Sequence, residues 1–176
     1  NSTFVHNGST FGADIFNGGT LHVTHSTFYS ATLPSLDSLH TGISQTVTIS
    51  NTILAAGNGI ANCGGDGVNL GADTLATDAT CPGATVVTLD ALKFGPLQIN
   101  GGNTATLALL PGSLALDAGD DAVCAAPTGA PAYGAGGVDQ RGILRPQGAH
   151  CDVGAYEQNL LLHMFLPVIL NLPPAP

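Results

Sequence analysis

Four cysteines are the residues in this chain whose chemistry is easiest to assign. They form an even set, and none lies in a CxxC motif or in a spaced Cys/His metal pattern. We therefore expect two disulfides in an oxidising compartment. The preferred connectivity of the three that are possible is the sequence-local one, Cys63 with Cys81 and Cys124 with Cys151. Each bridge would contribute on the order of 3 kcal/mol.

The histidines and clustered aspartates are weaker candidates for metal ligands. His22 and His25 are three residues apart on an expected strand and so point to opposite faces, which argues against a two-His site. A polar position at a corner is the preferred role for His25. Asp117, Asp120 and Asp121 offer oxygen ligands for Ca²⁺, but their spacing matches no full calcium loop and favours turn capping. We predict no catalytic residue, no cofactor and no metal, with Ca²⁺ the one cation considered.

Most of the other ionisable groups fall in one C-terminal stretch. An active site is conceivable there, but a structural role is preferred, because arginine has five fixed donors that can tie carboxylates and loop carbonyls together. The residues of this structural motif are Asp117, Asp139, Arg141, Arg145, Asp152 and Glu157.

The composition limits both partners and fold. Charged residues make up 9% of the chain and hydrophobic residues 44%, and the formal net charge is −9. Nucleic acid and anionic lipid are poor partners because both require a basic patch. Trp is absent, Asp far outnumbers Glu, and Gly, Asn, Ser and Thr are abundant, which favours strands and turns over helices.

A repeat with a period in the twenties organises the first third of the chain. Asn1–Phe4, His25–Phe28 and Asn51–Leu54 align, with offsets of 24 and 26 residues. The second and third copies follow alternating strands, Thr20–Thr24 and Thr46–Ser50. Such a repeat predicts an all-β fold, a right-handed parallel β-helix (a three-sided solenoid) with an irregular, disulfide-pinned C-terminal module.

Stacking of these copies makes specific contacts predictable. Phe4, Phe28 and Leu54 should form one interior ladder with a spacing of about 4.8 Å, and Asn1, His25 and Asn51 a polar ladder at a corner. The first copy has no strand before it, so we expect the starting layer to present unpaired backbone groups that a partner must cover. Either upstream residues or a neighbouring subunit would do so.

Several ordered motifs in the last two thirds of the chain resemble a known family. They are Leu109–Ser113, Leu116–Asp120, Asp139–Gly142 with Arg145–Gly148, and Cys151–Glu157. Together they resemble the choice-of-anchor Q C-terminal module of bacterial secreted and surface proteins with parallel β-helix repeats. The resemblance implies a surface location and a β-helix fold, and it implies no enzymatic activity.

These observations divide the chain into β-helix coils at 1–60, the choice-of-anchor-Q-like module at 61–157 and an apolar, Pro-rich tail at 158–176. The tail is too short and too interrupted to span a bilayer. We expect a secreted or cell-surface structural protein that assembles head-to-tail into a filament or surface layer. The residues predicted to mediate this self-association are Asn1, Phe4, Leu161, Phe165, Leu166, Val168 and Leu170.

Two other function classes stay open at this point. A surface adhesin or glycan-binding protein would use the long polar faces, although the chain has three Tyr and no Trp to form an aromatic stripe. A polysaccharide lyase or hydrolase is the less favoured class, because lyases need basic residues and the chain has only three, Lys93, Arg141 and Arg145. A hydrolase would need two carboxylates facing one cleft.

Overall fold

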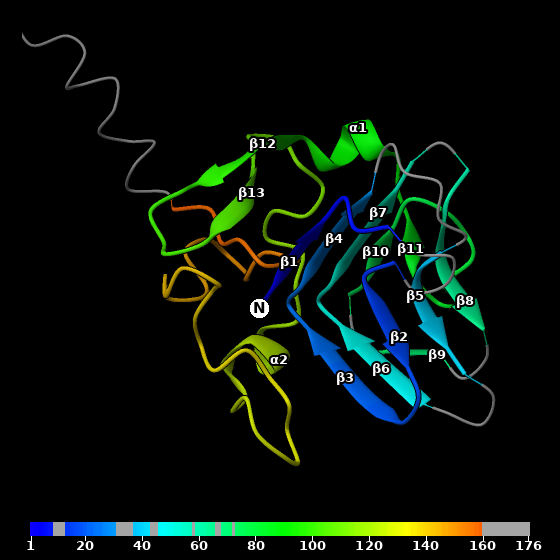
Figure 1. Cartoon of the computed structure of the whole chain (residues 1–176). Coiled ribbons are helices and arrows are strands. Elements are labelled where there is room, and N and C mark those ends of the chain that lie inside the picture. Colours follow the sequence, from blue (N-terminus) through cyan, green and yellow to red (C-terminus); the bar gives the residue numbers. More distant parts are fainter. Residues whose placement is uncertain are drawn as a thin grey trace, which may run out of the picture.

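The computed structural model describes residues 1–8, 13–30, 37–42, 46–57, 59–65, 68–71 and 73–159 (Figure 1). Most of the strands are short and pair in parallel. The largest sheet, called here the first sheet, has the strand order β1-β4-β7-β10-β11. Its strands are β1 (Thr3–Val5), β4 (Thr27–Ser30), β7 (Ile53–Ala56), β10 (Leu75–Ala76) and β11 (Thr85–Val86).

Two three-stranded parallel sheets accompany the first. The second sheet has the order β2-β5-β8 and the third has the order β3-β6-β9, so successive strands along the chain go to the first, second and third sheet in turn. The strands of the second sheet are β2 (Ile15–Asn17), β5 (Asp37–Thr41) and β8 (Ala61–Gly65). Those of the third are β3 (Thr20–Thr24), β6 (Thr46–Ser50) and β9 (Val68–Leu70).

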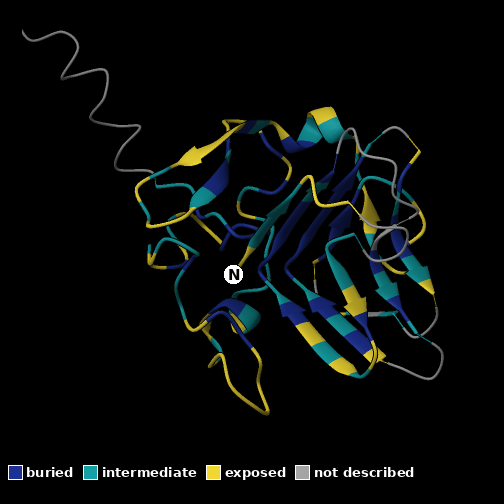
Figure 2. Cartoon of the chain, in the orientation of Figure 1, coloured by how far each residue is buried: buried dark blue, intermediate teal, exposed yellow. Residues whose placement is uncertain are grey.

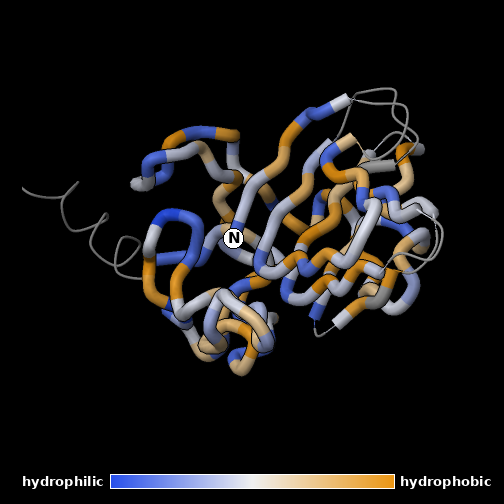
Figure 3. The backbone as a smooth tube through the Cα atoms, turned by 60° about the horizontal axis from the view of Figure 1, so that its bottom comes forward, coloured by the Kyte–Doolittle hydropathy of each residue, from blue (hydrophilic) through white to orange (hydrophobic). Residues whose placement is uncertain are grey.

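The registers confirm the ladder predicted from the repeat. Phe4 pairs with Phe28 and Phe28 pairs with Leu54. The two phenylalanine rings stack with their centroids 4.6 Å apart and their planes 4° apart. In the third sheet Leu21 lies beside Val47. Burial alternates along these strands (Figure 2), and so does hydropathy (Figure 3). Burial of these side chains, each contributing about 1.5–3 kcal/mol, specifies the register, since a shift by one residue would expose them.

The polar corner predicted at His25 and Asn51 also exists. Both residues have positive φ, 47° and 45°, and both are fully buried. Asn51 Nδ2 lies 2.8 Å from His25 Nε2, and the His25 N–H donates to the Ser50 carbonyl across the corner. Each corner therefore turns the chain from the third sheet into the first.

The remaining elements lie beside the sheets. Helix α1 (Leu89–Leu92) is capped by Thr88, and helix α2 (Asp121–Ala125) is capped by Asp120. Between them, β12 (Phe94–Ile99) and β13 (Ala105–Leu109) form an antiparallel pair. A second core lies between this region and the first sheet and includes Ile53, Leu92, Leu109 and Val153.

The fold class predicted from the sequence is wrong. The described residues form several short parallel sheets, a separate antiparallel pair and two short helices, with no closed or solenoid sheet. The reason is the length of the repeat: the second and third sheets end at β8 and β9, and beyond Leu70 the chain adds only two-residue strands to the first sheet. After Val86 no described strand pairs in parallel, so the regular pattern does not continue into the second half.

A membrane-spanning helix was not expected. Among the described residues, no helix has both the length and the apolar character that crossing a bilayer requires.

Candidate interaction site at the near sheet edge

Strands β1, β2 and β3 are the first strands of their sheets, and each lies at a sheet edge; together they form what we call the near edge (Figure 1). Between them is a cavity of about 390 Å³. Its apolar lining comes from all three strands, because the inward-facing side chains of each converge there: Phe4, Ile15, Leu21 and Val23. Phe4, Ile15 and Leu21 are only partly buried, unlike Phe28, Leu39 and Val47, their partners in the next layer.

One wall of the cavity is a loop from the second half of the chain. The Tyr133 ring stacks on the His22 ring with centroids 3.9 Å apart, and the Thr24 hydroxyl donates to the Tyr133 carbonyl at 2.7 Å. Asn1 Nδ2 donates to the Ala135 carbonyl at 3.1 Å. The loop therefore flanks the near edge at its corner, while the apolar floor of the cavity remains accessible.

The opposite edge of the second sheet, at β8, is covered by the chain itself. The Asn62 N–H donates to Asp78 Oδ2 at 3.0 Å, and the Cys63 N–H donates to Thr80 Oγ1 at 3.1 Å. The Cys63–Cys81 disulfide holds this covering segment in place. On this side of β8, where no described strand pairs with it, side chains thus accept its N–H groups.

Of the residues predicted to mediate self-association, Asn1 and Phe4 line the near-edge cavity. The others, Leu161, Phe165, Leu166, Val168 and Leu170, lie outside the described residues. The prediction that they act together with Asn1 and Phe4 stays a prediction.

The six charged residues of the predicted structural motif come together in the C-terminal loops. Arg145 Nη1 lies 2.8 Å from Glu157 Oε2, and both side chains are almost completely buried. Arg145 also donates to the carbonyls of Asp152 and Gly154, each at 2.7 Å. Glu157 in turn accepts the backbone N–H groups of Gln147 and Asp152.

Arg141 and Asp139 extend this network. Arg141 donates to Asp139 through Nε at 2.8 Å and also contacts the Glu157 carbonyl, and its guanidinium lies 3.7 Å from the centre of the Tyr156 ring. Asp139 accepts the N–H groups of Arg141, Ile143 and Glu157. These contacts use the arginine donors on loop carbonyls and carboxylates, the arrangement that was predicted for them.

Burial opposes the charges in this network. It lowers the pKa of Arg145 and raises the pKa of Glu157, although each ion favours the charged form of the other. The pKa of Asp152 rises to about 7, first because it is buried and second because Glu157 is near. A buried pair of this kind is sensitive to removal of either partner.

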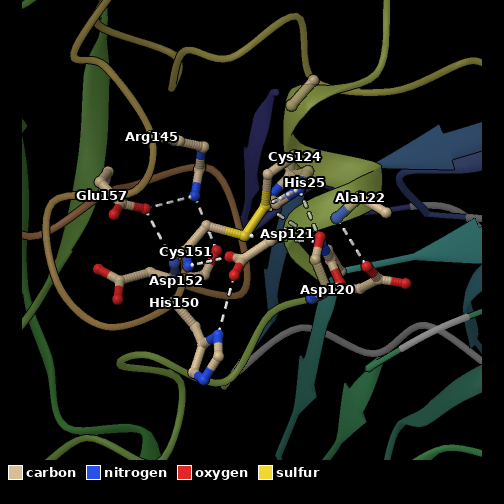
Figure 4. Close-up of a disulfide and its surroundings, with 12 residues drawn as sticks. His25, Asp120, Asp121, Ala122, Cys124, Arg145, His150, Cys151, Asp152 and Glu157 are labelled. Carbon is tan, nitrogen blue, oxygen red and sulfur yellow. Dashed lines mark hydrogen bonds and ion pairs between the residues drawn. A yellow bond between two sulfur atoms is a disulfide. The ribbon is translucent and has the colours of Figure 1, made fainter.

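Both predicted disulfides are present, Cys63–Cys81 and Cys124–Cys151. The second lies beside His25: the ring Nε2 is 3.1 Å from Cys124 Sγ, and all three residues are buried (Figure 4). Burial lowers the pKa of His25 to about 2, with a smaller contribution from Arg145. The sequence offered no signal for this contact, because His25 is 99 residues from Cys124.

The three aspartates considered for Ca²⁺ bind protein donors. Asp120 Oδ1 accepts the Ala122 N–H at the start of α2, as predicted for a turn cap. Asp121 accepts the Cys151 N–H and contacts His150 Nδ1, and Asp117 accepts the His150 N–H. Oxygens that could bind a cation are therefore used in tying α2 to the Cys151 loop.

Sequence reasoning missed most of the cavity lining. Leu21 and Val23 lie on the expected strand Thr20–Thr24, and their alternation with polar residues was the one available signal that they face inward. Tyr133 and Thr128 come from a loop more than a hundred residues away, which no local pattern connects to β3.

Comparisons with protein-family models, with curated proteins and with solved structures return no match for this chain.

Proposed function

We propose that this chain is a non-catalytic structural protein that associates with further copies of itself outside the cell, by accepting an extended apolar segment along its near edge. The observation that carries the proposal is the near edge itself. Three edge strands meet around a cavity of about 390 Å³ whose apolar lining is the partly exposed end of the core.

The backbone of β1 suits strand addition. His6 donates its N–H to Tyr29 in β4, so by alternation the N–H groups of Thr3 and Val5 point away from β4. An extended segment placed there would gain main-chain hydrogen bonds, and its alternate side chains would enter the cavity. Each large apolar side chain buried in this way would contribute about 1.5–3 kcal/mol.

The occupant that we propose is the apolar segment 160–172 of a second copy. Its residues are mostly Leu, Ile, Val, Phe and Met, which match the apolar lining of the cavity. A contact between the near edge of one copy and the tail of another uses two different surfaces, so each copy can bind one neighbour through its edge and another through its tail. Such contacts generate filaments or layers.

An extracellular location accords with the two disulfides, which persist in oxidising environments. The motifs that resemble the choice-of-anchor Q module, from Leu109 to Glu157, also support a location on the surface of a bacterial cell. The formal charge of −9 argues against nucleic acid as a partner.

Sedimentation velocity tests the proposal on four proteins: the full chain, residues 1–159 and two proline variants of the full chain. Val5→Pro removes an N–H that points away from β4, and proline is tolerated on edge strands. The matched control is Val86→Pro on β11. Its neighbours Thr85 and Val87 donate to the carbonyls of Thr74 and Ala76, so the Val86 N–H also points away from its sheet.

The expected result is that the full chain and Val86→Pro form concentration-dependent assemblies, whereas Val5→Pro and residues 1–159 sediment as monomers. A synthetic peptide of residues 160–172 should bind residues 1–159 and not their Val5→Pro variant. Monomeric full chain at all concentrations, or equal assembly by the two proline variants, would overturn the proposal.

A further inference from the structure

A histidine and two cysteines from three distant parts of the chain converge at helix α2 (Figure 4). The His25 ring nitrogen and the sulfurs of Cys124 and Cys151 all lie within 4.8 Å of one another. His25 comes from the corner between β3 and β4, Cys124 from α2 and Cys151 from the loop that follows the Arg145 segment. None of the three side chains is exposed to solvent.

The ring nitrogen that faces the sulfurs carries a lone pair. Asn51 Nδ2, which can only donate, lies 2.8 Å from His25 Nε2, so Nε2 accepts and the proton of the neutral ring is on Nδ1. The same Nε2 lies 3.1 Å from Cys124 Sγ. The neutral imidazole is in the protonation state that a metal ligand requires, and a cation bound at Nε2 would replace the hydrogen bond from Asn51.

The surroundings hold the Asn51 corner and the Cys151 backbone against α2. The Asn51 amide accepts the Asp120 N–H and donates to the Asp120 carbonyl, each at 3.0 Å, which joins the corner to the start of α2. The Cys151 N–H donates to Asp121 Oδ1 at 2.9 Å. These contacts do not use the sulfur–sulfur bond, so they remain available when that bond is broken.

We infer that the reduced form of this chain holds a thiophilic d¹⁰ cation such as Zn²⁺ between Cys124, Cys151 and His25. A phosphine or dithiol reductant supplies two electrons to the disulfide, and the two sulfurs take up two protons as thiols. Binding of the cation releases those two protons, and the two thiolates and His25 Nε2 donate three lone pairs to it. Oxidation to the disulfide removes two of the three ligands, so that the bond and the cation exclude each other.

The choice of cation follows from the donor set. Thiolate and imidazole ligands select Zn²⁺ or Cu⁺ over Ca²⁺ and Mg²⁺, which prefer oxygen. Three protein ligands leave a fourth position on Zn²⁺ for a water molecule or a nearby carbonyl. The site is independent of the self-association proposed above, since it involves neither the near-edge cavity nor residues 160–172.

Titration of the chain with Co²⁺, a spectroscopic substitute for Zn²⁺, tests this inference under a phosphine reductant. Reduced wild type should bind one Co²⁺ with sulfur-to-cobalt charge-transfer bands, and Zn²⁺ should displace it. The control Cys63→Ser/Cys81→Ser lacks the other disulfide pair, which is not part of the His25 cluster, and should bind equally well. Cys124→Ser/Cys151→Ser and oxidised wild type should bind none.

His25→Asn isolates the histidine. Asparagine already stands at the equivalent corner, Asn51, with the same positive φ, so the corner should be retained. Loss of an outer-shell partner weakens metal binding by roughly 10–100-fold. Loss of His25, a direct ligand, should weaken the affinity for the cation by at least as much. Unchanged affinity in His25→Asn, or binding by reduced wild type no tighter than by Cys124→Ser/Cys151→Ser, would overturn the inference.

Circular dichroism covers the case in which reduction unfolds the chain. Zn²⁺ should then restore the folded spectrum of reduced wild type and of Cys63→Ser/Cys81→Ser, because binding to the folded state stabilises it. Failure of Zn²⁺ to restore it, or equal recovery in Cys124→Ser/Cys151→Ser, would also count against the site.

Discussion

The near edge and the edge at β8 end the same stack of parallel strands in different ways. At β8 the chain supplies its own substitutes for a partner strand, with Asp78 and Thr80 accepting the N–H groups of Asn62 and Cys63. At β1, β2 and β3 a loop flanks the corner, but the apolar floor stays accessible. An unpaired edge can accept another strand, so the comparison shows one edge that the chain itself covers and one whose apolar floor it leaves accessible.

The buried Arg145–Glu157 pair lies in the C-terminal loops, where the Arg145 N–H also donates to the Gly137 carbonyl near the loop that flanks the near edge. Breaking this pair should have the largest effect on stability. Glu157→Gln leaves Arg145 charged and without its carboxylate partner, which should lower the free energy of unfolding by about 3–5 kcal/mol. Urea denaturation followed by circular dichroism measures the loss.

Asp90→Ala, at an exposed position in α1, serves as the control and should change stability by less than about 1 kcal/mol. Equal effects of the two variants would show that the buried network does not hold the flanking loops.

The disulfide at the β8 edge should come next in size. Cys63→Ser/Cys81→Ser removes the bridge between two cysteines that are 18 residues apart in sequence, and it should lower the free energy of unfolding by about 3 kcal/mol. Because the covering segment is then released, this variant should also expose β8 and associate more readily than wild type. Denaturation and sedimentation velocity measure the two effects, and a stable, unassociated variant would contradict this account of the cover.

The His25 corner, which follows β3 of the near edge, should make stability dependent on pH. The pKa of His25 is about 2 in the folded chain and near 6.5 when the ring is in water, so in this interval the unfolded chain binds a proton that the folded chain does not. Stability should therefore fall as the pH drops below about 6.5, by about 1.4 kcal/mol for each pH unit.

Denaturation of wild type and His25→Asn at pH 7, 6 and 5 separates this contribution from those of the acids. The difference in the free energy of unfolding between the two proteins should change by about 1.4 kcal/mol for each pH unit below about 6.5. Stability profiles that run parallel with pH would show that protonation of the His25 ring does not destabilise the folded chain.

The smallest effect is expected at a single capping carboxylate. Asp78→Ala leaves the buried Asn62 N–H without its acceptor and should cost about 1–3 kcal/mol. Thr85→Ala, at an exposed position on β11, is the matched control and should stay within about 0.5 kcal/mol of wild type. An Asp78→Ala variant with the stability of wild type would mean that the edge at β8 does not require this hydrogen-bond acceptor.

Local pattern determined a large part of this structure. Alternation of apolar and polar residues located Thr20–Thr24 and Thr46–Ser50, and the repeat predicted the pairing of Phe4 with Phe28 and Leu54, because a one-residue shift would move every apolar side chain out of the core. The disulfide pairing was also predictable, since both bridges join cysteines that are close in sequence.

Only the tertiary structure decided where the repeat stops and what lies beside it. The solenoid expectation failed because the strand pattern weakens after Leu70, and the chain then pairs β12 with β13 in the antiparallel sense. Likewise, His25 meets Cys124 and Cys151, and Tyr133 meets His22, through contacts that span about a hundred residues or more. Such contacts depend on how whole elements pack, and the local spacing of residues along the chain does not determine that packing.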